Sequence, residues 1–147
     1  MLLIHGVGGD STNWAEIAPR LATRFDVISM DLRGHGKSGR IAGALGVEDL
    51  ARDALQVMDA AGIATCRVVG MSLGGVVAQS IALDFPERVE KLAVIGTVSG
   101  RTPEQRSKAL ERIEFLKQQG LRAVAEGNRE RWFSEEFQRE HPEIVAA

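Results

Sequence analysis

Short apolar runs alternate with longer amphipathic segments along residues 1–100. The apolar runs span residues 2–5, 26–31, 67–71 and 91–96. Each run is too short and too continuously apolar to form a free-standing amphipathic helix, and a glycine or a turn follows most of them. Alternation of this kind is the sequence form of βαβ units. It predicts an α/β fold with a mostly parallel sheet and helices on both of its faces.

Three segments between these runs are predicted to be helices: 13–23, 47–61 and 74–84. The second begins with Glu48 and Asp49, where the helix dipole favours negative charge, and Gly62 follows its end as a C-cap. The third stops before Pro86, because proline cannot continue the hydrogen-bond ladder of a helix. We expect these helices to pack on the sheet.

The character of the sequence changes after residue 100. Thr102-Pro103 is a good helix start, since proline suits the first position of a helix, and residues 106–119 are charged and amphipathic. Residues 121–137 continue as one helix or more, and His141-Pro142 closes the pattern. We therefore expect two parts, a core of residues 1–100 and a helical cap segment of residues 101–147.

The motif Gly70-Met71-Ser72-Leu73-Gly74 has the form G-x-S-x-G and stands between a predicted strand and a predicted helix. This context is that of a nucleophile elbow, a tight and strained turn that lifts the serine hydroxyl above the carboxyl edge of the sheet. The N-terminus of the following helix favours developing negative charge. Ser72 is therefore the candidate nucleophile. The alternative is a serine that only caps the helix.

The glycine-rich run His5-Gly6-Val7-Gly8-Gly9 directly follows the first predicted strand. Its glycines allow the backbone to approach whatever lies above Ser72. We expect an oxyanion hole made by the N–H groups of Val7 and Leu73. The alternative is a phosphate cradle, for which neither G-x-G-x-x-G nor a following Gly-Lys-Ser/Thr is present.

A third motif, Asp31-Leu32-Arg33-Gly34-His35-Gly36-Lys37-Ser38, follows the second predicted strand. With the two motifs above, it resembles the α/β-hydrolase fold family over nearly the whole chain. In that family this turn is chiefly architectural, and the family's strand order puts strand 26–31 two places, about 10 Å, from the strand of Ser72. The resemblance implies that His35 is not the catalytic base. Asp31 and His35 as a metal pair lack a third ligand.

Residues 131–143 give a narrower resemblance. Arg131-Trp132-Phe133-Ser134, Phe137 and His141-Pro142-Glu143 are similar to the cap segment of 3-oxoadipate enol-lactonases and related carboxylic-ester hydrolases. The resemblance implies a mostly apolar substrate pocket, lined by Gly6, Met71, Trp132 and Phe133. The alternative is an amphipathic helix whose aromatic side chains only pack against a neighbour.

The chain departs from the family at the acid and the histidine that complete the family's Ser–acid–His catalytic triad. The family carries its acid and then its histidine after the cap, and we expect this chain to lack both, together with the first two strands of the family's sheet. Its histidines are His5, His35 and His141, and each has a better structural explanation than a catalytic one. Unpaired sheet edges favour a homo-oligomer, in which another protomer is one source of a histidine.

The remaining features narrow the class of function. A formal net charge of −2 gives no reason to expect a nucleic-acid partner, and no apolar run reaches the ~18 to 20 residues of a membrane span. The single cysteine, Cys66, suits a reducing cytoplasm, and no cofactor or metal is implied. We expect a serine-dependent hydrolase of a small-molecule ester or lactone that passes through an acyl-enzyme. The alternative is a non-catalytic binding module with a hydrolase-like pocket.

Overall fold

The computed structural model describes the backbone of residues 1–40 and 42–146, and the side chains of these residues outside 121–131 and 146. It divides into two compact units, Met1–Ser99 and Gly100–Ala147. The first unit holds the sheet, and the second is helical within its described residues. That the second unit is a cap stays a prediction.

The sheet of the first unit consists of parallel strands. They are β1 (Leu2–Ile4), β2 (Ile28–Met30), β3 (Cys66–Met71) and β4 (Val89–Ile95). The order in space is β2-β1-β3-β4, so β1 lies between two strands that come later in the sequence. The predicted parallel sheet is confirmed, with the predicted strand 26–31 shortened to β2. The order also confirms that the strand before His35 lies two places from the strand before Ser72.

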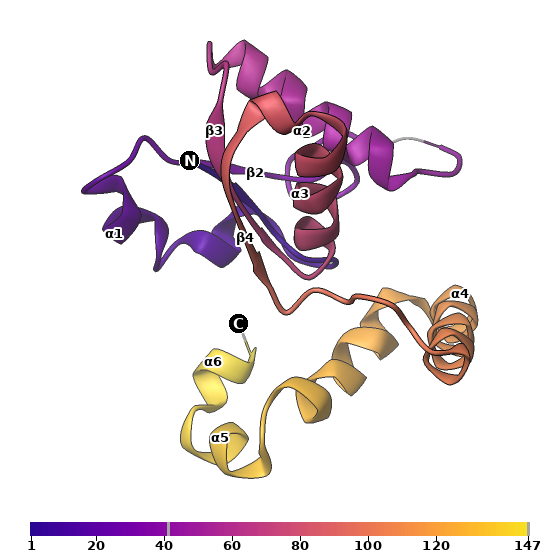
Figure 1. The fold of residues 1–147 in the computed structure, drawn as a ribbon. Helices are drawn as coiled ribbons and strands as arrows, with labels where there is room; N and C mark the ends of the chain where they lie inside the picture. The colour runs from indigo at the N-terminus through magenta and orange to yellow at the C-terminus, as the bar shows by residue number, and fades with distance from the viewer. Residues whose placement is uncertain (41, 147) are drawn as a thin grey trace. The chain divides into compact units, whose positions relative to one another are not determined.

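Two long helices cover one face of this sheet. They are α2 (Val47–Ala60) and α3 (Leu73–Asp84), and α3 is followed by the 3-10 turn η2 (Pro86–Arg88). Asp49 accepts a hydrogen bond from the N–H of Gly46 at 3.0 Å, which closes the first turn of α2. Figure 1 shows α2 and α3 on one side of the strands and α1 (Ala18–Ala22) on the other. Both helices were expected from the sequence.

The predicted single helix over residues 13–23 is wrong. The structure has a 3-10 turn, η1 (Ser11–Trp14), and the separate short helix α1. Asp10 caps η1 by accepting the N–H of Thr12 at 2.8 Å. Pro19 lacks the N–H that a continuous helix would donate to the carbonyl of Ala15, so the two pieces do not merge.

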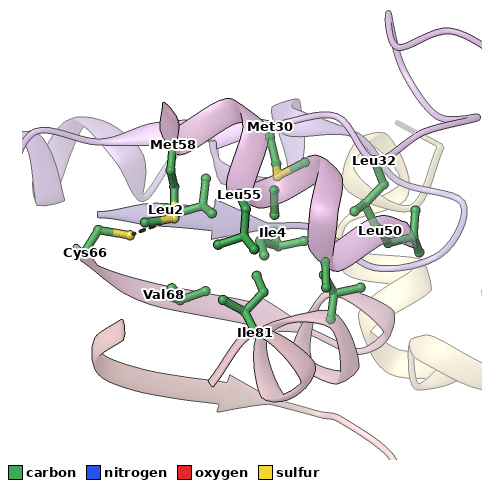
Figure 2. Packing of buried hydrophobic residues seen from close by; sticks show 14 residues of the cluster. Leu2, Ile4, Met30, Leu32, Leu50, Leu55, Met58, Cys66, Val68 and Ile81 are labelled. Carbon is green, nitrogen blue, oxygen red and sulfur yellow. Dashed lines mark hydrogen bonds between the residues drawn. The ribbon is translucent and has the colours of Figure 1, made fainter. Parts of the chain in front are cut away.

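The core lies between the strands and the two long helices. Leu2 and Ile4 of β1, Val68 of β3, Leu55 of α2 and Ile81 of α3 belong to one buried cluster (Figure 2). Full burial of one such side chain stabilises the fold by roughly 1.5–3 kcal/mol. This layer therefore fixes β1 and β3 side by side, with their carboxyl ends at one edge of the sheet.

β4 is more exposed than the other strands. It pairs with β3, and within the described residues no strand lies on its other side. Leu92, Val94 and Ile95 are 40%, 41% and 48% exposed. An open edge with apolar side chains is a surface for association, and a homo-oligomer through it stays a prediction.

The second unit begins with α4 (Pro103–Trp132), which is interrupted at Gly120, where φ is 80° and ψ is 173°. It continues with α5 (Glu135–Glu140) and α6 (Pro142–Ala146). The predicted helix start at Thr102-Pro103 is confirmed. The expectation that His141-Pro142 closes the helical pattern is wrong, because Pro142 stands at the first position of α6, where a missing N–H costs nothing. Among the described residues, no helix is both long enough and apolar enough to cross a membrane.

Candidate active site

Ser72 stands between the last residue of β3 and the first residue of α3. Its backbone has φ 51° and ψ −114°, and it is the one non-glycine residue with a positive φ in the described chain. A backbone in this region costs about 1–3 kcal/mol and is kept only where the surroundings enforce it. The Ser72 side chain makes no capping hydrogen bond to α3. The alternative of a serine that only caps the helix is therefore wrong.

Gly70 allows the chain to turn this sharply. A Cβ atom at residue 70 would lie 2.2 Å from the carbonyl oxygen of Gly74 and 2.6 Å from the nitrogen of Gly75. Any side chain at residue 70 would collide with the first turn of α3. The first glycine of the G-x-S-x-G motif is thus required by the close approach of strand and helix.

The end of β4 holds the elbow from one side. The N–H of Ser72 donates to the carbonyl oxygen of Ile95 at 2.9 Å, and Thr97 Oγ1 donates to the carbonyl oxygen of Ser72 at 3.1 Å. Thr97 was not among the residues expected from the sequence to form the site. Its one signal was its place just after strand 91–96.

The loop after β1 lies against Ser72. A Cβ atom at Gly6 would be 3.1 Å from Ser72 Cβ and 3.7 Å from Ser72 Oγ. This closeness follows from the parallel pairing of β1 with β3, because the segments that follow the two strands begin at the same edge of the sheet. Within the described part of the chain, the N–H groups of Val7 and Leu73 make no hydrogen bond. Both predicted oxyanion donors are therefore free.

His5 is fully buried beneath this loop. Its Nε2 accepts the N–H of Leu32 at 2.9 Å, and its Nδ1 lies 2.7 Å from the carbonyl oxygen of Gly6. The ring also meets the ring of His35 edge-on, with centroids 5.2 Å apart. Both nitrogens of His5 are thus engaged with the backbone, and neither is free to take a proton from Ser72.

The sequence profile of the α/β-hydrolase fold family matches residues 1–144. The chain belongs to the α/β-hydrolase fold family. Its relatives include a provisionally named carbamate hydrolase, RutD, from Caulobacter segnis, 36% identical over 84% of this chain and 47% of the relative. Another is 3-oxoadipate enol-lactonase 2 from Acinetobacter baylyi, 29% identical over 99% of this chain and 54% of the relative.

Solved structures agree with the family. The enol-lactonase from Burkholderia xenovorans superposes with a TM-score of 0.89 at 29% identity, covering 99% of this chain and 55% of that one. The chain spans about half the length of the curated relatives it matches. The resemblance to enol-lactonases that the sequence indicated is confirmed as a similarity of sequence and of fold.

In this α/β-hydrolase, Asp31 serves the architecture of the loops. Its two oxygens accept the N–H groups of Ser11 at 2.7 Å and Lys37 at 2.8 Å. These backbone hydrogen bonds lower the pKa of the Asp31 carboxyl from its ordinary value of 3.8 to about 2. His35 lies nearby with Nδ1 3.2 Å from the carbonyl oxygen of Arg33. Among the side chains that the structure describes, no group of three His, Cys, Asp or Glu residues is arranged to hold a metal.

The aromatic residues proposed for the pocket belong to the second unit. The rings of Phe133 and Phe137 stack at 5.3 Å, and Phe137 contacts His141 at 4.7 Å. Trp132 is 63% exposed. Phe133 therefore packs against Phe137 of its own unit. A pocket that joins Trp132 and Phe133 to Gly6 and Met71 stays a prediction.

Two hollows of the first unit lie away from Ser72. One of about 470 Å³ is bordered by η1, α1 and β2, and one of about 300 Å³ lies beside α2. Neither is lined by Gly6, Met71 or Ser72. The candidate site is therefore described by the backbone geometry around Ser72.

Proposed function

We propose that this chain carries the nucleophile and the oxyanion hole of a serine hydrolase that acts on a carboxylic ester or lactone. The observation that carries the proposal is the backbone of Ser72, held at φ 51° beside the glycine loop of β1. A strained serine that caps no helix is what a nucleophile elbow requires. The 3-oxoadipate enol-lactonase relative supports an ester or lactone carbonyl as the target.

The proposed reaction forms an acyl-enzyme. Ser72 Oγ bonds to the carbonyl carbon while its proton passes to a base, and the carbonyl oxygen becomes an oxyanion that accepts the N–H groups of Val7 and Leu73. Collapse of this intermediate breaks the ester C–O bond, and the leaving alcohol takes the proton from the base. Water then hydrolyses the acyl-enzyme and frees Ser72.

Neither histidine of the first unit is a good candidate for the base. His5 uses both ring nitrogens on backbone groups, and His35 follows a strand two places from β3. This observation favours a second candidate function, a binding module that keeps the hydrolase architecture without turnover. The buried thiol of Cys66 suits the cytoplasm, which we keep as the proposed location.

Intact-mass analysis after reaction with a fluorophosphonate separates the two candidates. A hydrolase adds one phosphonate per chain, loses this adduct in Ser72→Ala and hydrolyses p-nitrophenyl esters. Ser80→Ala, at a half-buried position of the same helix α3, is the matched control and retains the label. A folded chain that takes up no phosphonate and turns over no ester contradicts the hydrolase and leaves the binding module.

A further inference from the structure

Two peptide units beside Ser72 have their carbonyl oxygens bound by side chains. The Gly6 carbonyl, in the Gly6–Val7 peptide, contacts His5 Nδ1 at 2.7 Å. The Ser72 carbonyl, in the Ser72–Leu73 peptide, accepts the hydroxyl of Thr97 at 3.1 Å. A trans peptide is planar, and its C=O and N–H point in opposite directions. A side chain that fixes either carbonyl therefore also fixes the N–H of Val7 or Leu73.

The contacts of His5 determine which of its two ring nitrogens carries the hydrogen and donates. Because Nε2 accepts the N–H of Leu32 at 2.9 Å, that nitrogen carries no hydrogen, and the ring hydrogen is on Nδ1. The bond from Nδ1 to the Gly6 carbonyl is thus a donation to it. The ring is fully buried and anchored on the backbone beyond β2, so it holds this carbonyl from a fixed point. The N–H of Gly9 donates to the same oxygen at 3.2 Å.

Thr97 follows Gly96, just after the end of β4, and its side chain contacts the elbow. A Cβ atom added to Gly75 would lie 1.8 Å from Thr97 Oγ1, so the hydroxyl sits directly on the first turn of α3. Thr97 Oγ1 also lies 3.4 Å from the Ile95 carbonyl, but its shorter contact, 3.1 Å, is to Ser72. The Ser72 carbonyl further accepts the N–H groups of Gly75 and Val76, at 3.0 and 3.3 Å.

We propose that His5 and Thr97 are positioning residues that aim the two oxyanion donors. His5 sets the direction of the Val7 N–H, and Thr97 sets the direction of the Leu73 N–H. Neither side chain touches the substrate, since each acts on the far end of the peptide whose N–H does. The inference rests on the proposed function of Ser72 and adds to it the residues that keep its oxyanion hole in place.

Thr97→Val tests one half of the proposal, because valine has the shape of threonine without the hydroxyl. We expect the rate of fluorophosphonate labelling, and kcat where esters turn over, to fall about tenfold with KM unchanged. This loss is smaller than the ~10² to 10³ for removal of a donor, because the Leu73 N–H is still present. Thr97→Ser keeps a hydroxyl and restores the rate to within about threefold.

His5→Asn and His5→Gln test the other half. The amide nitrogen of asparagine occupies nearly the position of Nδ1 and can still donate to the Gly6 carbonyl, whereas glutamine reaches toward the position of Nε2. We expect His5→Asn to label about tenfold faster than His5→Gln. Equal rates in these two variants, or a wild-type rate in Thr97→Val, overturn the assignment.

NMR of the folded chain decides the inference without any catalysis. The carbonyl carbon of Ser72 and the amide of Leu73 shift in Thr97→Val and keep their wild-type positions in Thr97→Ser. In the unmodified chain, the ring nitrogens of His5 report hydrogen on Nδ1. Hydrogen on Nε2, or unmoved Ser72 and Leu73 signals in a folded Thr97→Val, refutes the inference. An unlabelled wild-type chain with these NMR signals intact refutes only the proposed function.

Discussion

Gly74 lies so close to Ile4 that a Cβ atom at residue 74 would be 2.2 Å from the Ile4 carbonyl oxygen. The contact joins the first turn of α3 to the last residue of β1, across the pairing of β1 with β3. Because the neighbouring atoms belong to the backbone, no rotation of a side chain can relieve it. The elbow and the glycine loop are therefore held together by a contact that only glycine allows.

Gly74→Ala is expected to lower the free energy of unfolding by about 3 kcal/mol, since an inserted methyl group must push apart two backbone segments. Urea unfolding followed by circular dichroism measures this loss. Gly39→Ala is the matched control, because a Cβ atom at residue 39 meets nothing within 4 Å. Equal stability of the two variants would show that α3 and β1 do not approach as closely as described.

Ser72→Gly is expected to raise the free energy of unfolding by about 1 kcal/mol. Glycine relieves the strain of φ 51°, and part of that gain is offset by the greater freedom of the unfolded chain. Ser80→Gly, inside α3, is expected to have the opposite sign, with a loss of about 0.5 kcal/mol. Thermal and urea unfolding give both signs. A destabilised Ser72→Gly would mean that Ser72 is not strained.

Asp31→Asn is expected to lower stability at pH 7 and to lose this effect in acid. The folded-state pKa of about 2 lies below the ordinary 3.8, so the carboxylate stabilises the fold above pH 3.8. That contribution is lost as the pH falls through about 2. Urea midpoints of the two chains should converge between these values. Asp84→Asn, on the exposed end of α3, serves as the control and changes stability little at either pH.

The thiol of Cys66 is expected to react with an aromatic disulfide reagent at least about a hundredfold more slowly in the folded chain than in urea. It is 5% exposed, lies in the core beside Met58, and burial raises its pKa, so little thiolate is present at neutral pH. Absorbance of the released thiolate gives the rate, and one thiol per chain in urea is the reference. Rapid reaction of the folded chain would place Cys66 at the surface.

The strands and the elbow were predictable from the sequence because local signals determine them. The apolar runs, Gly70, and the end of α3 before Pro86 each act through neighbouring residues or through a single steric demand. The break between η1 and α1 was missed, since apolar spacing over residues 13–23 outweighed the effect of Pro19. Proline at a first helical position was likewise misjudged at Pro142.

The parts of the site that the sequence did not reveal depend on contacts between distant segments. Thr97 meets Ser72 across 25 residues, and His5 meets Leu32 across 27. Neither residue type nor spacing distinguishes these contacts from those of an ordinary loop threonine or a core histidine. Only the order of the strands brings them together.

The central place of β1 also has a consequence for how the chain acquires its structure over time. Leu2, Leu3 and Ile4 are fully buried, yet one of their two neighbouring strands, β3, begins only at Cys66. At synthesis rates of about 5–20 residues per second, the intervening stretch takes roughly 3–12 s to make. Throughout that interval the most apolar strand stays open to chaperones and to other nascent chains. The pairing of β1 with β3, which supports Ser72, can therefore form only after β3 has been synthesised, although β1 is made earlier.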